Sequence, residues 1–176
     1  NAWCVLALID ELGLDVKKTA EHLSEFKALA GRGAKHLLSL VNGGKYTLID
    51  DSYSGQPEAM KIAIKSLGNM KTDGRKIAVL GKMAELGDTS KAQHIEIGKV
   101  VEDSDIDIVI GVCEEMKDML AQVSDDKEKH YFENKEGLDE FLLNKCLQNN
   151  DIVLIKGARY SSKLYQVTEK LLEKGK

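Results

Sequence analysis

Two carboxylates and an aromatic side chain follow an apolar segment early in the chain. Residues 50–57 read Asp-Asp-Ser-Tyr-Ser-Gly-Gln-Pro, directly after Ile49. Asp51 and its neighbours are residue types that hold a ribose or a metal ion. The same types also form ordinary turns, and Pro57 suits the first turn of a helix. By itself this stretch therefore favours a turn that caps a helix.

A second candidate loop holds an acidic residue between two glycines. Residues 81–88 read Gly-Lys-Met-Ala-Glu-Leu-Gly-Asp. Glu85 is of a type that orients a cation or an amine, although the spacing requires neither and fixes no metal site. His94 falls in the first turns of the helix that follows, where a histidine is more often a surface or capping residue than a catalytic base.

Two cations flank a glycine near the end of the chain. Lys156 and Arg159 lie on either side of Gly157, after the last apolar segment and before the last helical one. Backbone N–H groups at a helix start, together with these two side chains, would bind an anion. In residues 31–33, Gly-Arg-Gly, Arg32 is placed either to reach a phosphate or to point into solvent.

Several kinds of site are absent from the sequence. It contains no Gly-x-x-x-x-Gly-Lys-Ser/Thr phosphate loop, no nucleophile elbow and no cluster of Cys and His. The three cysteines are widely separated and have apolar neighbours, which predicts buried thiols in a reducing compartment. The residues alone thus indicate an anion-binding edge without a self-contained active site.

Composition sets the class of protein. The chain has 176 residues, of which 43% are hydrophobic and 31% charged, which fits one globular domain with a surplus at the front. A net charge of −4 argues against a nucleic acid or an anionic membrane as partner. No apolar stretch approaches the roughly 20 residues that span a bilayer. We expect a cytoplasmic monomer.

Hydrophobic periodicity predicts the elements that position these loops. A β-hairpin is expected where residues 37–41 and 46–49 flank Asn-Gly-Gly. After it, short apolar strands alternate with amphipathic helices: strands at 77–80, 108–112, 131–132 and 152–155, and helices at 60–67, 92–101, 116–120, 138–147 and 164–172. This alternation predicts a Rossmann-like α/β fold with a mostly parallel sheet and helices on both faces. Two helices, 1–12 and 15–23, precede it.

Taken together, the motifs resemble the C-terminal part of the Mur ligase family, most closely its branch that adds D-alanyl-D-alanine to UDP-N-acetylmuramoyl-tripeptide. That branch reads Asp-Asp-Ser-Tyr-Asn-Ala-Asn-Pro against residues 50–57, Gly-Asp-Met-x-Glu-Leu-Gly against residues 81–87, and Lys-Gly-Ser-Arg against residues 156–159. The N-terminal stretch resembles the tail of the family's central domain, with Asn1 and Ala2 in its Asn-x-x-x-Ala helix and Gly31-Arg32 at the inter-domain link.

The resemblance implies a division of the chain and an activity. Residues 1–33 would be the helical tail and linker of a central ATP-binding domain, and residues 34–176 the C-terminal substrate and lid domain. The full-length enzyme would use ATP and Mg²⁺ to convert a carboxylate into an acyl-phosphate, which an amine then attacks. Because the chain begins at Asn1 and lacks the phosphate loop, we expect it to be an inactive piece of that enzyme.

The resemblance also implies roles for single residues. Asn1 would lie against the adenine, Arg32 would reach the ATP phosphates, and Asp51 and Tyr53 would contact the nucleotide. Glu85, Lys156 and Arg159 would line the pocket for the incoming amino acid or dipeptide, with the cations facing its carboxylate. No catalytic residue and no metal ligand is assigned to this chain.

This chain departs from the family pattern at several positions, and two other functions stay open. Ser54 and Gln56 replace two Asn of the family, and Lys82 replaces an Asp beside the expected amine site. A sister ligase with a different amine substrate is one alternative. A non-catalytic Rossmann-like binding module is the other.

Overall fold

A computed structural model describes residues 2–25 and 28–175, so the expected adenine contact, Asn1, lies outside the described residues. The elements in chain order are α1 (Ala2–Glu11), α2 (Val16–His22), η1 (Leu23–Glu25), β1 (Ala34–Ser39), β2 (Lys45–Asp51), α3 (Pro57–Gly68), β3 (Lys76–Gly81), η2 (Gly87–Thr89), α4 (Ser90–Glu102), β4 (Ile108–Val112), α5 (Met116–Leu120), β5 (Glu128–Phe132), α6 (Leu138–Phe141), η3 (Leu142–Cys146), β6 (Ile152–Lys156), α7 (Arg159–Ser162) and α8 (Tyr165–Lys174).

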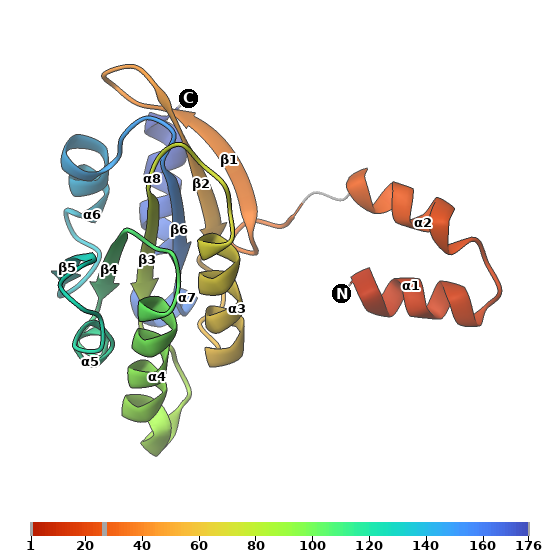
Figure 1. The fold of residues 1–176 in the computed structure, drawn as a ribbon, viewed down its shortest axis with the longest axis horizontal. Helices are drawn as coiled ribbons and strands as arrows, with labels where there is room; N and C mark the ends of the chain where they lie inside the picture. Colours follow the sequence, from red (N-terminus) through yellow and green to blue (C-terminus); the bar gives the residue numbers. More distant parts are fainter. Residues whose placement is uncertain (1, 26–27, 176) are drawn as a thin grey trace.

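A six-stranded sheet of order β1-β2-β6-β3-β4-β5 forms the centre of the fold (Figure 1). The strands β2, β6, β3, β4 and β5 pair in parallel, and only β1 is antiparallel to its neighbour. The β1–β2 pair is the expected hairpin, with Gly43 and Gly44 both at positive φ in its turn. The predicted mixed, mostly parallel α/β fold is therefore confirmed.

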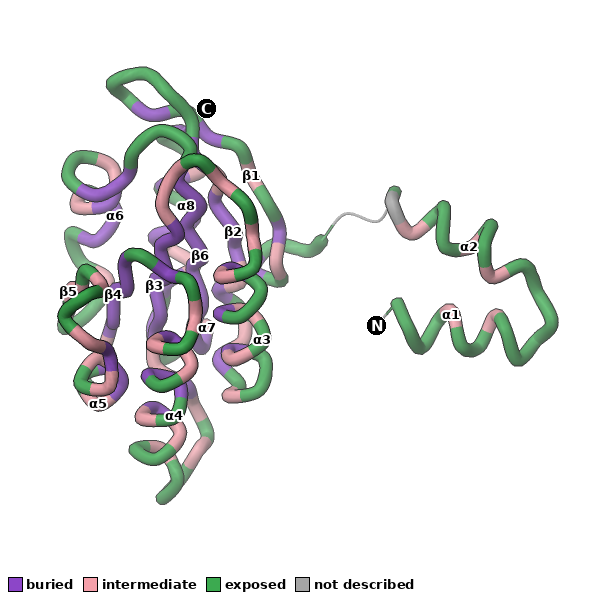
Figure 2. Tube along the Cα trace, in the orientation of Figure 1, coloured by how far each residue is buried: buried purple, intermediate pink, exposed green. Residues whose placement is uncertain are grey.

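Alternate residues of each strand face two separate layers of helices. On one face, α3, α4 and α5 contribute Met60, Ile97 and Met116 to a core that includes Ala78 and Leu80 of β3. The other face packs the remaining β3 side chains against α6 and α8. Figure 2 shows the central strands as the most buried part of the molecule. The strands read as continuous apolar runs because both faces are covered.

Helices α1 and α2 contact each other and contribute no buried residue. Asp15 caps α2 as expected, accepting a hydrogen bond from the Lys18 amide at 3.0 Å. Trp3 is 80% exposed, and Figure 1 shows both helices set apart from the sheet. None of the described helices is long and apolar enough to cross a membrane.

The helix expected over residues 138–147 is present, as a short α-helix that continues into a π-helical turn over Leu142–Cys146. One prediction about local structure is wrong. The three thiols are not uniformly buried: Cys146 is buried, Cys113 is half-buried and Cys4 is exposed. Cys4 is exposed because it belongs to α1, a helix that contacts α2 and has no buried residue. Burial raises the pKa of Cys146 to about 11.

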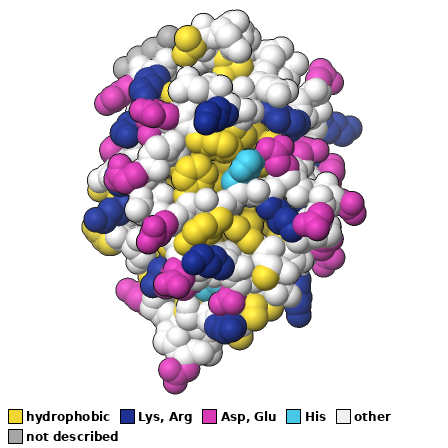
Figure 3. All heavy atoms as spheres, turned by 90° about the vertical axis from the view of Figure 1, so that its left-hand side faces the viewer, with side chains coloured by type: hydrophobic (Ala, Val, Ile, Leu, Met, Phe, Trp, Pro, Cys, Tyr) yellow, Lys and Arg dark blue, Asp and Glu magenta, His cyan; other side chains and the backbone are white. Residues whose placement is uncertain are grey.

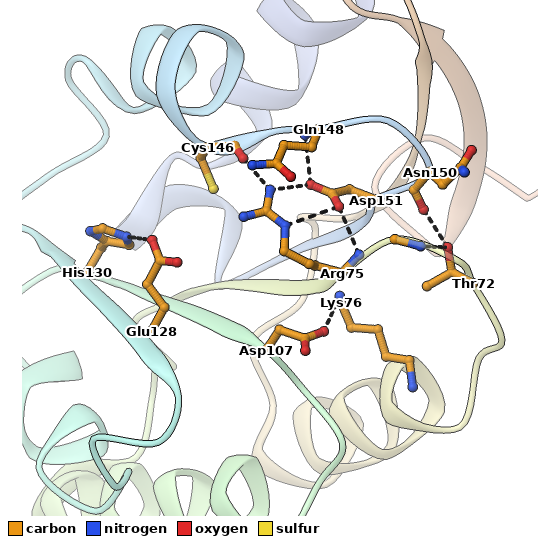
Figure 4. A network of polar contacts seen from close by, with 11 residues as sticks. Thr72, Arg75, Lys76, Asp107, Glu128, His130, Cys146, Gln148, Asn150 and Asp151 are labelled. Atoms are coloured by element: carbon orange, nitrogen blue, oxygen red, sulfur yellow. Dashed lines mark hydrogen bonds and ion pairs between the residues drawn. The ribbon is translucent and has the colours of Figure 1, made fainter.

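A buried ion pair fixes the amino-terminal edge of the sheet (Figure 4). The carboxylate of Asp151, just before β6, accepts hydrogen bonds from the Arg75 amide and guanidinium just before β3. It also accepts one from the Gln148 amide. Because Asp151 is only 1% exposed and all these donors are aimed at it, the register of β3 against β6 is fixed here. At the opposite, carboxyl-terminal edge of the sheet, loops make the contacts between neighbouring strands.

The β5 edge of the sheet is covered by aromatic side chains. His130 and Phe132 of β5 both pack against Phe141, with ring centroids 4.7 and 5.3 Å apart. Figure 3 shows this side of the molecule, where hydrophobic side chains gather in the middle and charges of both signs surround them. Such a border of charges discourages pairing of the edge strand with another chain.

Tyr46 in β2 offers a test of the core. Its ring is fully buried and its hydroxyl has no hydrogen-bond partner among the described residues. Burial raises the pKa of Tyr46 to about 12. Since the hydroxyl makes no hydrogen bond, Tyr46→Phe is expected to leave the free energy of unfolding within about 0.5 kcal/mol of wild type or to raise it. Urea denaturation measures this.

The matched variant Tyr46→Ala is expected to lose about 3 to 5 kcal/mol because it removes the ring from the core. A loss above about 1 kcal/mol in Tyr46→Phe would show that the hydroxyl has a partner, such as a buried water.

Candidate functional site

Three loops meet at the carboxyl-terminal edge of the sheet because β2, β6 and β3 are neighbours. They are residues 52–56, 157–158 and 82–86. Backbone hydrogen bonds join them: the Arg159 amide donates to the Tyr53 carbonyl at 3.2 Å, and the Ala158 amide donates to the Lys82 carbonyl at 3.1 Å. The loop after β6 is thus bonded to both of its neighbours. This is the edge at which doubly wound sheets bind ligands.

Lys156, the last residue of β6, lies beneath the first loop. Its ammonium donates to the Asp51 carboxylate at 2.6 Å and to the Ser54 carbonyl at 3.0 Å. The residue is 1% exposed, and Asp51 is half-buried. The expectation that Lys156 lines the substrate pocket stays a prediction; in this structure its ammonium is turned inward to Asp51. Lys156 ties the loop after β2 to the strand beside it.

Glycines allow the loops to approach so closely. A Cβ atom on Gly55 would lie 2.6 Å from the Ala158 amide nitrogen, and one on Gly157 would lie 3.0 Å from the Gly81 Cα atom. Real Cβ atoms essentially never lie as close as the first distance, and the second is tighter than most Cβ contacts. The glycines that read as turn residues in the sequence therefore serve backbone packing between loops.

The Gly-Arg-Gly segment is bonded to the same edge. The buried Asp50 carboxylate accepts from the Gly31 amide at 2.7 Å and from the Ser52 hydroxyl at 2.6 Å. The Tyr53 amide donates to the Gly31 carbonyl, and the Arg32 guanidinium lies 4.2 Å from the centre of the Tyr53 ring. Arg32 is thereby held against the aromatic ring of the first loop.

A pocket of about 240 Å³ opens between the three loops. Its lining includes Tyr53, Glu85 and Arg159 from the predicted set, together with Tyr160, whose ring is exposed at the pocket. Arg32 and Asp51 line a separate, mostly apolar hollow of about 370 Å³ beside α3, which also includes Lys35. The predicted residues therefore divide between two neighbouring hollows, and Lys156 lines neither.

Glu85 and Arg159 are the two charged groups of the pocket. Among the described residues no ion pair is found for either. Arg159 lies near two aromatic rings: its guanidinium carbon is 4.0 Å from the centre of the Tyr165 ring and 5.8 Å from that of the Tyr53 ring. A carboxylate and a guanidinium on one small pocket suit a ligand that carries an amine and a carboxylate.

The lysine that departs from the family pattern has its own partner. The Lys82 ammonium pairs with Glu115, at the start of α5. Burial of Glu115 is the largest single influence and works against its charged form, but the hydrogen bond from Lys82, a backbone hydrogen bond and the nearby positive charge together hold the pKa of Glu115 below its usual value. The positive charge at position 82 is therefore compensated outside the pocket lining.

His94 is the residue whose position the sequence argument missed. It is fully buried, and its ring contacts the backbone of the loop that carries Glu85. The signal was present: His94 precedes Ile97 and Val101 by three and seven residues, so it shares the buried face of α4 with them. A histidine on the apolar face of a helix is expected to be buried in the core.

Comparison with known proteins agrees with this architecture. The family model described as "Mur ligase, glutamate ligase domain" matches residues 38–159. UDP-N-acetylmuramoyl-tripeptide–D-alanyl-D-alanine ligase of Buchnera aphidicola is 35% identical over 81% of this chain and 30% of its own length. The Bacillus subtilis ligase of the same name is 29% identical over 98% of this chain and 37% of its own length.

Solved structures show the same fold. MurF from Acinetobacter baumannii superposes with a TM-score of 0.78 at 23% identity, over 98% of this chain and 36% of that one. MurF from Thermotoga maritima in complex with ADP gives 0.72 at 26% identity, over 96% and 37%.

The Lys156–Asp51 pair is expected to stabilise the edge. Lys156→Met leaves a half-buried carboxylate without its cation, and we expect a loss of about 3 kcal/mol in the free energy of unfolding. The double variant Lys156→Met/Asp51→Leu should recover part of that loss, because it also removes the unpaired charge. Urea denaturation of the three variants in a double-mutant cycle measures the coupling.

Lys61→Met, which removes a half-buried lysine on α3 that pairs with the exposed carboxylates of Glu58 and Glu96, is the control and is expected to cost less. Additive effects of Lys156→Met and Asp51→Leu would contradict the coupling.

The chain spans about a third of the length of the relatives that it matches. The family model covers more than half of the chain, and the motifs of all three loops lie within the residues that it matches. The chain therefore belongs to the Mur ligase family.

Proposed function

We propose that this chain is the C-terminal part of an ATP-dependent ligase that adds D-alanyl-D-alanine to UDP-N-acetylmuramoyl-tripeptide in peptidoglycan precursor synthesis. The curated relatives carry that activity in their names. Residues 1–33 correspond in this proposal to the tail of the ATP-binding domain and its linker, and residues 34–176 to the substrate and lid domain. The enzyme acts as a cytoplasmic monomer.

The observation that carries the proposal is the pocket between the three loops, with Glu85 and Arg159 on one lining. A dipeptide at neutral pH carries an ammonium at one end and a carboxylate at the other. Arg159 suits the carboxylate because a guanidinium binds it with two parallel hydrogen bonds. Glu85 suits the ammonium of the dipeptide, which must lose a proton before its nitrogen can attack the acyl-phosphate.

The chain's own residues orient the amine for its reaction. The amine nitrogen attacks the carbonyl carbon of an acyl-phosphate, the C–N bond forms, the C–O bond to phosphate breaks, and the proton lost from the nitrogen passes to the departing phosphate. Glu85 and Arg159 hold the two ends of the dipeptide. This fixes the position of the amine relative to the acyl-phosphate and makes the reaction between them effectively unimolecular. The loops around them exclude water from the reactive acyl-phosphate.

The nucleotide is assigned to the neighbouring hollow. Arg32, Lys35 and Asp51 line it, and Arg32 stacks on Tyr53. The cations suit phosphate oxygens and Asp51 suits a ribose hydroxyl. Mg²⁺ would be held mainly by the central ATP-binding domain and the ATP phosphates in this proposal. Among the described residues, no three His, Cys, Asp or Glu side chains gather as a metal site.

Charge removal in the pocket tests the assignment. In the full-length protein, Glu85→Gln and Arg159→Gln are each expected to raise KM for D-alanyl-D-alanine about tenfold or more, since each removes a charge-assisted hydrogen bond. KM for ATP should stay within about twofold. The measurement is phosphate release that depends on the dipeptide and on UDP-N-acetylmuramoyl-tripeptide.

Glu173→Gln, on the exposed side of α8, is the matched control for charge removal. Dipeptide KM values that match wild type in both pocket variants would exclude this pocket as the amine site.

The chain alone is expected to release no ADP from ATP, because its sequence holds no phosphate loop. Coupled detection of ADP at high protein concentration measures this, with the full-length protein as the positive control. ADP release by the 176-residue chain would overturn its assignment as one part of the ligase.

A further inference from the structure

His94 uses both of its ring nitrogens on backbone groups. Its Nδ1 lies 2.8 Å from the Ser90 carbonyl oxygen, one turn earlier in α4, and its Nε2 lies 3.2 Å from the Met83 amide. A carbonyl can only accept, so Nδ1 carries the proton and Nε2 accepts from Met83. The histidine is a neutral strut between helix α4 and the loop after β3.

That loop carries a backbone conformation that needs support. Glu85 has φ of +61°, in the left-handed region that few residues other than glycine adopt. Such a residue persists where its surroundings fix it. Around Glu85, the Met83 side chain is buried in the core at 1% exposure, and the Lys82 carbonyl accepts from the Ala158 amide.

The hydrogen bond to His94 fixes the Met83 amide, two residues before Glu85. Without it, the buried amide loses its acceptor, and the backbone between Lys82 and Glu85 gains freedom to leave the left-handed turn. His94 is not part of the pocket lining. Any effect of His94 on a ligand must therefore pass through the loop.

We propose that His94 is a positioning residue for the amine pocket: through the Met83 amide it holds Glu85 in the orientation that faces the substrate ammonium. This inference rests on the proposed function of the pocket. In this proposal, dipeptide binding depends on the tautomer of His94, because Nε2 must be free of a proton to accept from the Met83 amide. The His94 ring itself contacts neither substrate nor nucleotide.

Hydrogen exchange in the 176-residue chain tests the strut itself. His94→Leu keeps the buried volume and removes the acceptor, so the Met83 amide is expected to exchange about tenfold faster. His94→Gln keeps an oxygen that accepts from Met83 and should stay within about twofold of wild type. Ser90→Ala keeps the Ser90 carbonyl and removes the Ser90 hydroxyl, which lies 3.5 Å from His94 Nδ1; as the control it should stay within about twofold of wild type because the shorter bond to the carbonyl remains.

Protection at Val79 and Ile110, in the strand cores, must stay unchanged, which separates a local loss from unfolding. Unchanged exchange at Met83 in His94→Leu, or equal acceleration in His94→Gln and His94→Leu, would overturn the proposal.

Kinetics of the full-length protein test the consequence for substrate. His94→Leu is expected to raise KM for D-alanyl-D-alanine about tenfold with KM for ATP nearly unchanged, and His94→Gln to restore it to within about threefold of wild type. If Glu85→Gln raises the dipeptide KM and His94→Leu does not, the His94 proposal alone fails. If Glu85→Gln has no effect either, the pocket assignment fails and the His94 proposal fails with it.

Discussion

A buried ammonium holds the functional edge of this molecule together. Lys156 ends the central strand β6 and pairs with Asp51 at the end of β2, with a further hydrogen bond to the Ser54 carbonyl. A lysine buried to this extent is stable in its charged form only when its partner is close and well oriented. The loop after β2 must therefore stay against β6, and the Tyr53 ring must stay beside Arg159.

The rest of the edge is built outward from that pair. The order β2-β6-β3 places three loops side by side, and glycines let their backbones touch. The Asp50 carboxylate bonds the Gly-Arg-Gly segment to the first loop, and His94 supports the third. Glu85 and Arg159 remain as the two pocket charges without an ion-pair partner among the described residues. In the proposed function, these two charges bind the two ends of a zwitterionic substrate.

Hydrophobic periodicity predicted the fold well, because a sheet covered on both faces imposes continuous apolar strands and amphipathic helices. It predicted a helix over residues 138–147 but not its π-helical turn at residues 142–146, because that turn keeps the apolar spacing of an ordinary helix. Motif order predicted which loops form the edge. It did not predict which cation faces the pocket: Lys156 and Arg159 have similar positions in sequence, and only packing buries one against Asp51 and stacks the other on Tyr165.

In the proposed function, the pocket between the three loops binds the zwitterionic amine substrate. The most direct measurement is a crystal structure of the full-length protein with D-alanyl-D-alanine bound. We expect the dipeptide carboxylate within hydrogen-bonding distance of the Arg159 guanidinium and its ammonium beside Glu85. A dipeptide bound at another place, with Glu85 and Arg159 both in solvent, would contradict the account.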